Sequence, residues 1–413
     1  MTANQVVVVG AGIVGVSSAI YLRRAGFNVT VIDPLPSPGG ASFGNAGIIS
    51  ADTTLPIALP GMLWKVPGWL ADPMGPLTVR KRYLLKAMPW LMRWVRAGFM
   101  DRVIPISEAI RSLHKDAWDV YRDLLTPDAF SDLLRPGGHV QMWNGDEVSK
   151  TGKLEHEIRT RLGVESQRLS RSDLRNMFPG IADKPMTGYM IRGNGHTVSP
   201  RRLVRHLCDV ARAEGAVFVP ERVMKLIPGE AGGWTIMTNA ANHLAEKVLV
   251  AAGAWSSSLL DPIGVKLPLD TERGYHAMIA DPSIALPYTI LHKDWGMSLS
   301  PMDEGLCASG TVEIAGVAAA PDENRARILA QKARYVFPDL KGRDPILWMG
   351  CRPSFPDTLP VIDAAPGHRD LYLFFGHGHY GMTGGPTGAR LIAQMMRGSA
   401  PSIDMRPYSA TRF

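Results

Sequence analysis

The fold is decided by residues 5–33, which read QVVVVGAGIVGVSSAIYLRRAGFNVTVID. The run Val6–Val9 predicts a buried strand, and Val29–Ile32 predicts a second strand after an amphipathic helix. Between the first strand and the helix lie three glycines at the spacing GxGxxG: Gly10, Gly12 and Gly15. This order of strand, glycine loop, helix and strand is typical of a βαβ unit that binds a dinucleotide.

Each glycine and the acid that follows have a physical role in such a unit. Gly10 allows the tight turn, Gly12 lets the backbone approach a pyrophosphate, and Gly15 lets helix and strand pack closely. The amino terminus of the helix offers free N–H groups and the positive end of its dipole to phosphates. Asp33, at the end of the second strand, can accept hydrogen bonds from a ribose diol and would repel a 2′-phosphate. We therefore expect a dinucleotide, and NADP is disfavoured.

The rest of this sheet is expected from segments that lie far along the chain. A nicotinamide dehydrogenase would usually continue with further βα units, but residues 34–50, PLPSPGGASFGNAGIIS, break that pattern. The sheet pattern resumes near residue 197, with a helix that starts at Ser199-Pro200. Strands are then predicted at Ala216–Val219, Lys247–Ala251 and Leu371–Phe375, and a hairpin is predicted from Val223–Ile227 and Trp234–Thr238. The glycine run GHGHYGMTGGPTG, residues 376–388, follows the last strand, and a helix is predicted from Ala389.

With these segments in place, the chain resembles the D-amino acid oxidase/dehydrogenase (DAO) superfamily of FAD enzymes, which also holds glycine and sarcosine oxidases. Within it, the chain is most similar to bacterial D-amino acid dehydrogenases (DadA-like proteins), including D-hydroxyproline dehydrogenases. Beyond the first thirty residues, five motifs carry the resemblance: GGASFGNAG (39–47), VLVAAGAWS (248–256), the RG of TERGYH (271–276), GCRPSFPDTLPVI (350–362) and GHGHYGMTGG (376–385).

The resemblance implies an α/β fold, α+β overall, with two domains. A Rossmann-like FAD-binding domain would be assembled from the separated segments 1–60, 190–265 and 355–413. A substrate-binding domain with an antiparallel sheet and helices would take up residues 61–189 and 266–354.

The resemblance also implies how FAD is held. Some relatives tether the flavin through a histidine of the 41–47 loop or a cysteine near the GxRP motif. This loop has no histidine and Cys351 is one position off, so we expect noncovalent FAD. The residues expected to bind it are Gly10, Ala11, Gly12, Ile13, Val14, Gly15, Asp33, Pro34, Ala41, Ser42, Asn45, Ala46, Gly47, Val223, Ala252, Gly253, Trp255, His377, Gly378, His379, Tyr380, Gly381, Met382 and Thr383.

The glycine run before the last helix is expected to face the flavin ring. Backbone N–H groups near residues 381–385 could stabilise the negative charge that develops at the N1/O2 edge of a reduced flavin. A loop that merely caps the terminal helix is the structural alternative.

The residues expected to carry the chemistry are Arg352, Tyr275, His276 and His379. The resemblance implies that Arg352 grips the substrate carboxylate, for which a planar guanidinium fork is suited. Tyr275 and His276 follow Arg273-Gly274 and are specificity candidates; period-2 alternation predicts that only one of them faces the substrate.

The histidines of the glycine run, and one near the start of the second sheet segment, have a structural alternative as well as a functional one. His377 and His379 would lie on one side of the chain if the glycine run were extended, and one could contact the flavin or the substrate amine. A histidine that only satisfies a turn is the alternative. His196 is a weaker candidate, and no metal site is expected.

The implied activity is oxidative deamination of a D-amino or cyclic imino acid. A hydride would pass from the α-carbon to flavin N5, and the imine would hydrolyse to a keto acid. Electrons would go to a quinone or another acceptor. The alternatives are a glycine- or sarcosine-type amine oxidase that uses oxygen, and an FAD-carrying module that binds a membrane surface or RNA.

Charge and cysteine usage bound the surroundings of the protein. The net charge of +7 favours anionic partners. Three scattered cysteines without metal spacing fit a reducing cytoplasm. We expect no signal peptide and no membrane span, so the protein is expected in the cytoplasm, with a peripheral place on the inner face of the membrane as an alternative.

Basic and aromatic residues interleave over residues 63–100, where four of the ten tryptophans fall. An anionic membrane surface attracts such a stretch. RNA would also suit it, although no nucleic acid partner is expected. A helix pair with core aromatics and solvated basic residues is the structural alternative, and Pro89 is expected to interrupt any single long helix.

Overall fold

The computed structural model describes residues 4–34 and 40–413. A six-stranded sheet in the order β10-β2-β1-β14-β21-β20 joins strands that lie far apart in the sequence. Its strands are β1 (Gln5–Val9), β2 (Asn28–Ile32), β10 (Val217–Val219), β14 (Lys247–Val250), β20 (Val361–Ala364) and β21 (Leu371–Phe375). They run parallel except β20, which pairs antiparallel with β21. The predicted discontinuous sheet is confirmed.

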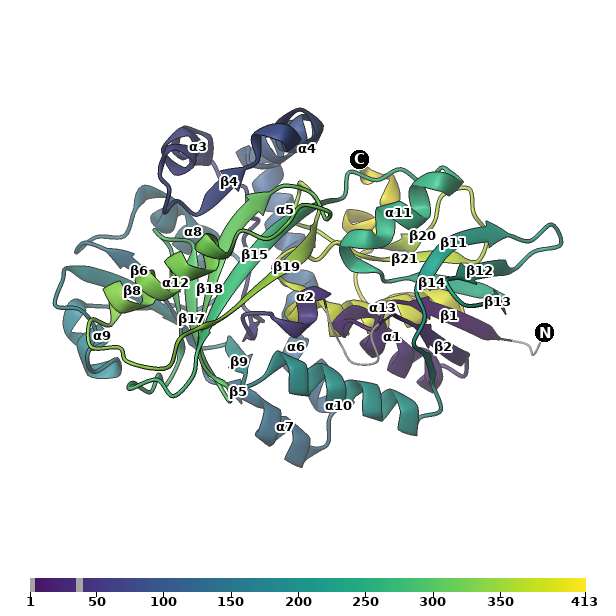
Figure 1. Ribbon diagram of the computed structural model, residues 1–413, viewed down its shortest axis with the longest axis horizontal. Coiled ribbons are helices and arrows are strands. Elements are labelled where there is room, and N and C mark those ends of the chain that lie inside the picture. Colours follow the sequence, from purple (N-terminus) through teal and green to yellow (C-terminus); the bar gives the residue numbers. More distant parts are fainter. Residues whose placement is uncertain (1–3, 35–39) are drawn as a thin grey trace.

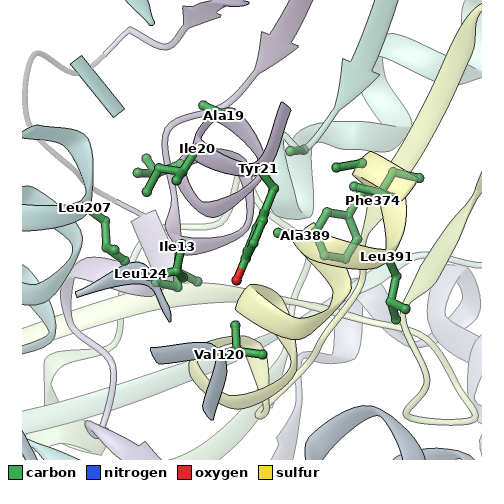
Figure 2. Close-up of a cluster of buried hydrophobic side chains, with 14 of the residues drawn as sticks. Ile13, Ala19, Ile20, Tyr21, Val120, Leu124, Leu207, Phe374, Ala389 and Leu391 are labelled. Atoms are coloured by element: carbon green, nitrogen blue, oxygen red, sulfur yellow. The ribbon is translucent and has the colours of Figure 1, made fainter. Parts of the chain in front are cut away.

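Helices cover one face of this sheet (Figure 1). They include α1 (Ile13–Arg24), α10 (Pro200–Ala213) and α13 (Gly381–Arg397). Side chains of α1, α13 and β21 meet in one buried cluster with the helix α6 (Ala117–Leu124), as Figure 2 shows. Val6 and Val8 of β1 belong to this cluster, whereas Val7 and Val9 face a second cluster on the other side. A strand buried on both faces explains the unbroken valine run.

The second face of the sheet is covered by a small antiparallel sheet and a short helix. These are β11 (Val223–Pro228), β12 (Trp234–Thr238), β13 (Asn242–Ala245) and α11 (Ser256–Leu260). The predicted hairpin of β11 and β12 is confirmed.

A nine-stranded sheet lies beside the first (Figure 1), with the path β19-β15-β18-β17-β16-β6-β8-β7 and with β4 paired to β18. Its strands are β4 (Leu77–Val79), β6 (His139–Asn144), β7 (Gln167–Leu169), β8 (Met186–Ile191), β15 (Asp270–Ile279), β16 (Thr289–His292), β17 (Met297–Met302), β18 (Gly305–Ile314) and β19 (Ile346–Ser354). Most neighbours pair antiparallel, as predicted for a substrate-binding sheet; β16–β6 and β18–β4 are parallel.

The remaining elements surround and connect the two sheets. The helices are α2 (Gly40–Phe43), α3 (Met62–Ala71), α4 (Leu84–Ala97), α5 (Met100–His114), α7 (Pro127–Leu133), α8 (Lys150–Arg161), α9 (Arg171–Met177) and α12 (Glu323–Val336). A three-stranded sheet comprises β3 (Ile48–Ile49), β9 (Gly195–Thr197) and β5 (Leu134–Pro136). This sheet combines strands from both predicted domains. The boundaries of those domains stay a prediction.

The last helix begins earlier than predicted, because most of the glycine run is helical. α13 starts at Gly381 rather than at Ala389. Glycine disfavours helices, but packing decides here: a Cβ at Gly388 would lie 2.5 Å from the ring of Phe374. Pro386 cannot donate to the carbonyl of Met382, and the hydroxyl of Tyr121 donates to that oxygen instead, at 2.6 Å.

The expectation that Pro89 interrupts a helix is wrong. α4 runs continuously from Leu84 to Ala97 with Pro89 inside it. Pro89 lies in the second turn, so only one backbone hydrogen bond near the helix start is lost. The boundary between α3 and α4 lies instead at the loop that carries β4.

Candidate active site

A cavity of about 1110 Å³ is lined by residues of both sheets and by α3 and α4. Pockets for one small molecule usually have 300–1,000 Å³. The volume therefore leaves room for a dinucleotide together with a small substrate.

The amino terminus of α1 forms one end of this cavity. Gly12, Ile13 and Val14 line it, and the first turn carries neither an acidic residue nor a side-chain cap. Ser42 Oγ accepts a hydrogen bond from the N–H of Ile13 at 3.1 Å. An N–H-rich helix start without negative side chains suits the phosphates of a dinucleotide.

The three glycines of the GxGxxG motif meet different requirements. Gly10 has φ +111°, and a Cβ there would lie 2.5 Å from the carbonyl oxygen of Ala251. A Cβ at Gly15 would overlap the carbonyl oxygen of Gly10, which brings α1 close to β1. At Gly12 the nearest atom to a Cβ is Ser42 Oγ at 3.2 Å, a tight contact that the end of this side chain could relieve by a small shift.

Most residues expected to bind FAD line the cavity. They are Gly10, Gly12, Ile13, Val14, Asp33, Pro34, Ala41, Ser42, Asn45, Ala46, Val223, Ala252, Gly253, Trp255, His377, Gly378, His379, Tyr380, Gly381 and Met382. The other four expected residues support the wall without lining it: Ala11, Gly15, Gly47 and Thr383. Gly39 of the GGASFGNAG motif lies outside the described residues.

Two hydrogen bonds show how the supporting residues act. The N–H of Ala11 donates to Oδ2 of Asp33 at 2.8 Å, which fixes that carboxylate at the end of β2. The hydroxyl of Thr383 accepts from the N–H of Ser50 at 2.9 Å. The residues present therefore fit the adenosine and pyrophosphate parts of FAD.

The amino terminus of α13 points its first turn at the same cavity. Gly381 and Met382 line it, while the N–H groups of Thr383 and Gly384 donate to the carbonyl oxygen of Tyr380. The positive end of a helix dipole is thus present where the glycine run was expected to face the flavin.

Arg352 lies in the wall formed by β15 and β19, which pair antiparallel. Its guanidinium lies over Gly274, where a Cβ would overlap it, and Nη1 donates to the carbonyl oxygen of Thr311 at 3.1 Å. Burial lowers the pKa of Arg352, and the charge of Glu272 opposes that effect. A half-buried guanidinium that faces a cavity is suited to a carboxylate ligand.

Glu272, which sequence reasoning missed, lies beside this arginine. Its Oε2 accepts from the hydroxyl of Ser354 at 2.7 Å and lies 3.2 Å from Nε2 of His379. Burial alone would raise the pKa of Glu272, but these hydrogen bonds and the charges of His379 and Arg352 outweigh it and hold the pKa below its usual value. Glu272 and His379 thus form a polar pair next to Arg352.

Tyr275 and His276 point to different surroundings, as alternation predicts. Tyr275 lines the cavity, and its hydroxyl donates to Oε2 of Glu313 at 2.6 Å. His276 lies behind the wall: its Nδ1 is 3.0 Å from the carbonyl oxygen of Gly44, and its ring stacks on Trp348 at 5.0 Å. Burial lowers the pKa of His276. The Tyr275 side chain is buried in a core cluster, so its place in the cavity lining gives it no advantage over His276, and both stay candidates for specificity.

The glycine run is not extended at His377 and His379, because Gly378 has φ +52° and turns the chain between them. His379 faces Glu272, whereas His377 is buried against the ring of Phe374, with 5.1 Å between centroids. Burial lowers the pKa of His377 to about 3. His196 lies in β9, where it pairs with Ile48 of β3, and it does not line the cavity.

The described residues hold no cluster suited to a metal ion. The three cysteines are free and buried, and burial raises the pKa of the Cys351 thiol. A protonated thiol is a poor nucleophile for a flavin tether.

Helices α3 and α4 project from the molecule at the top of Figure 1. We call their outer side the α3/α4 surface; its exposed apolar residues are Leu63, Trp64, Leu70, Leu84, Leu85, Met88 and Met92. Trp64 and Leu85 are each 86% exposed. Within residues 4–34 and 40–413, no helix has the length and apolar character to cross a bilayer.

Comparisons with known proteins agree with this geometry. A family model for FAD dependent oxidoreductases (DAO) matches residues 5–395. A D-amino-acid oxidase of Bradyrhizobium diazoefficiens is 38% identical over 99% of this chain and 99% of its own length. A D-amino acid dehydrogenase of Rhizobium johnstonii is 29% identical over 99% of this chain and 100% of its own length.

Solved structures share the fold. An L-proline dehydrogenase from P. horikoshii has a TM-score of 0.76 at 16% identity, covering 99% of this chain and 97% of that one. A glycine oxidase from Geobacillus kaustophilus has a TM-score of 0.72 at 19% identity and covers 100% of both chains. The predicted mixed α/β architecture is confirmed.

Proposed function

Because the chain belongs to the DAO family of FAD-dependent oxidoreductases, we propose that it oxidises a D-amino acid or a cyclic imino acid at the α-carbon. The observation that carries the proposal is the half-buried guanidinium of Arg352, laid over Gly274 in the wall of the cavity that also receives the amino termini of α1 and α13. It supports the proposal because this guanidinium could hold a carboxylate in the same cavity that the two helix termini line. FAD is proposed to be held without a covalent bond.

Arg352 would bind the α-carboxylate through its guanidinium fork, which fixes the orientation of the α-carbon. FAD, when bound, supplies the two-electron chemistry by accepting a hydride at N5. The substrate ammonium must first lose a proton, and we propose that His379 accepts it at Nδ1 while its Nε2–H is held against Oε2 of Glu272. The α-carbon then loses its hydrogen with the bonding electrons, and the resulting imine is hydrolysed by water to a keto acid and ammonia.

The test is anaerobic reduction of the purified yellow protein by a panel of D- and L-amino acids, glycine, sarcosine and hydroxyproline isomers. We expect D-amino or cyclic imino acids to bleach the visible flavin band. Bleaching by L-isomers alone would contradict the stereochemistry, and a flavin that no amino acid reduces would contradict the activity.

The acceptor has two candidates. Several relatives are named D-amino acid dehydrogenases, which favours a quinone or another carrier. The relative at 38% identity is named a D-amino-acid oxidase, which favours oxygen. We propose that the electrons pass to a quinone or another carrier. Admitting air to the reduced protein tests this, because the flavin of an oxidase is reoxidised at once and forms hydrogen peroxide, whereas that of a dehydrogenase stays reduced.

Substituting Gly274 with alanine is expected to weaken substrate binding and leave FAD in place. The new Cβ would overlap the guanidinium of Arg352, and a long flexible side chain yields more easily than backbone. We expect KM for a D-amino acid to rise roughly tenfold or more, because a displaced arginine loses its aligned fork. Steady-state kinetics measures this.

Gly68→Ala is the control, since a Cβ at Gly68 would meet nothing within 4 Å. An unchanged KM in Gly274→Ala would contradict the proposed place of the carboxylate.

The α3/α4 surface is proposed to bind an anionic membrane. Its exposed apolar side chains accompany basic ones, among them Lys65, Lys81, Arg82 and Arg93. Apolar burial and attraction to anionic lipid add on such a surface. Trp69 and Trp90 of the same helices line the cavity, so a membrane-borne acceptor would meet the protein beside its site.

We expect the protein to sediment with phosphatidylglycerol vesicles at low salt and to be released as salt is raised. The double variant Trp64→Ser/Leu85→Ser should bind at least about tenfold more weakly, because the exposed apolar area is lost. The matched control is Ile227→Ser/Leu244→Ser, which removes exposed apolar residues from the distant β11–β13 sheet. Equal binding by both double variants, or equal binding to phosphatidylcholine vesicles, would contradict this proposal.

A further inference from the structure

A second charged cluster lies in the wall of the cavity, on α8, β6 and the turn after β16. Arg159 donates from Nη2 to Oε1 of Gln141 at 2.7 Å and to Oε2 of Glu155 at 3.2 Å. Lys293 Nζ lies 2.9 Å from Oε1 of the same Glu155. All four residues line the cavity, yet the side chains of Arg159 and Glu155 are each only 3% exposed.

The cluster carries one positive charge more than its carboxylate balances. Arg159 and Lys293 are cationic, and Glu155 is the single carboxylate that both contact. His139 adds no charge near neutral pH, because burial and the neighbouring cations Arg159 and Lys293 lower its pKa to about 3. Asn194, which lies against His139, is neutral.

Besides Asp33 and Glu272, whose hydrogen bonds are described above, two other carboxylates in the wall are engaged elsewhere. Asp52 lies 2.8 Å from Nη1 of Arg111 and forms an ion pair with it. Asp294 is exposed and accepts from the N–H of Asn144 at 2.8 Å. Neither balances the excess charge at Arg159.

Arg159 also has unused hydrogen-bonding capacity. Its Nη1 is buried and has no hydrogen-bond partner among the described residues. A buried donor of a charged group without a partner is costly. An anion or a polar ligand group brought into the cavity would satisfy both the donor and the charge.

The two guanidinium groups belong to one continuous site. His379 lies beside Glu272 next to Arg352, and its ring centroid is 6.5 Å from that of Tyr380. Burial raises the pKa of the Tyr380 hydroxyl, which also senses the charges of Glu155, Arg159 and Glu272. Tyr380 therefore stands within electrostatic range of both clusters.

We propose that Arg159 is a specificity-determining residue that binds a second anionic group of the substrate, so that the cavity favours dicarboxylic amino acids of the D-aspartate and D-glutamate kind. This rests on the proposed oxidation of an amino acid held by Arg352. The α-carboxylate occupies Arg352, and the side-chain carboxylate reaches Arg159 past Tyr380.

The test compares ligands with one and two carboxylates on the FAD-loaded enzyme. Glutarate and butyrate cannot be oxidised, so their binding is read from the shift of the flavin spectrum. D-glutamate and D-alanine are then compared as reductants of the flavin in anaerobic stopped flow. We expect glutarate to bind about 10- to 100-fold more tightly than butyrate, the range for a charge-assisted hydrogen bond.

Arg159→Met should abolish that preference and leave butyrate binding and D-alanine oxidation within about threefold of the starting protein. Arg159→Lys keeps the charge but not the fork, so it should retain part of the preference and shows that the site tolerates change. Arg161→Met, an exposed position on the same helix, is the matched control and should change nothing.

Equal binding of glutarate and butyrate to the unaltered enzyme would overturn the proposal, as would equal weakening of both by Arg159→Met, which would mark a structural ion pair. These outcomes differ from failure of the proposed activity. In that case no amino acid bleaches the flavin, whatever the two acids do to its spectrum.

Discussion

Arg352→Ala is expected to nearly abolish flavin reduction by the amino acid substrate while the protein keeps its FAD. Truncating one partner of a buried, hydrogen-bonded charge pair costs about 2–5 kcal/mol. At a fixed substrate concentration this corresponds to roughly 30- to 4,000-fold in the apparent second-order rate constant of reduction. The loss should appear mainly as weaker substrate binding, because the guanidinium is proposed to contact the carboxylate and not the reacting carbon.

The fold should tolerate this change, because Arg352 makes few bonds to the protein. Its Nη1 donates to the carbonyl oxygen of Thr311, which lies in the cavity wall, where we expect water to replace the missing donor. Glu272 keeps Ser354 and His379 as hydrogen-bond partners. Its pKa should rise toward the usual range, because the Arg352 charge is one of the effects that lower it.

Anaerobic stopped-flow spectroscopy of the flavin band measures the effect, and the FAD content of the purified variant is the internal check. Arg352→Lys should recover part of the affinity, because it keeps a charge but loses the fork. Arg343→Ala is the matched control, since the Arg343 side chain is 78% exposed in the loop before β19. If Arg352→Ala binds and oxidises the substrate as the unaltered protein does, the carboxylate lies elsewhere.

The parts of this fold that could be predicted are those where a local pattern has one physical meaning. The valine run of β1 is buried on both faces, so it reads as a central strand. Gly10 and Gly15 are required by a left-handed turn and by close packing, which is why the GxGxxG spacing identified the cradle. Arg352 was located because a short motif surrounds it, and it does line the cavity.

The start of α13 could not be predicted, because tertiary packing overrides local propensity there. Glycine and proline between residues 381 and 388 disfavour a helix when read locally. Their reasons lie in other elements: the ring of Phe374 excludes a side chain at Gly388, and the hydroxyl of Tyr121 satisfies the carbonyl that Pro386 leaves unpaired. No pattern within the run reveals these partners.

The charged partners in the site were missed for a related reason. Glu272 meets Ser354 across 82 residues and His379 across 107, and each looks like an ordinary polar residue in its own segment. Arg159 lies on α8 among other charged residues and reads as part of a solvated face, yet it is buried. Glu272 reaches the wall because β15 pairs with β19 and the loop that carries His379 packs beside them. Arg159 reaches the wall because α8 packs against β6, where it contacts Gln141.

Gly12→Val is expected to give a folded protein that no longer holds FAD. Gly12 has φ −68°, which a valine adopts without strain, and the nearest atom to its Cβ would be Ser42 Oγ at 3.2 Å. The side chain would therefore extend over the start of α1 on the cavity side, where a pyrophosphate needs close approach to the backbone. We expect at least about 3 kcal/mol of lost affinity, or roughly 100-fold or more in Kd.

The neighbouring glycines provide a contrast that separates binding from folding. Gly15→Ala places a Cβ onto the carbonyl oxygen of Gly10, and Gly10→Ala forces a residue with a side chain into φ +111° beside Ala251. Backbone atoms cannot move aside as the end of a side chain can. Gly10→Ala and Gly15→Ala should therefore lower the free energy of unfolding of the protein stripped of FAD, whereas Gly12→Val should not.

Fluorescence titration with FAD and thermal unfolding of the stripped proteins resolve the two effects. For Gly12→Val we expect a raised Kd for FAD and an unchanged Tm. For Gly10→Ala and Gly15→Ala we expect a lowered Tm. Normal FAD affinity in Gly12→Val would mean that the pyrophosphate does not cross the start of α1. An unchanged Tm in Gly15→Ala would mean that α1 and β1 need not pack as closely as they do, so that the third glycine of the motif serves only the cofactor.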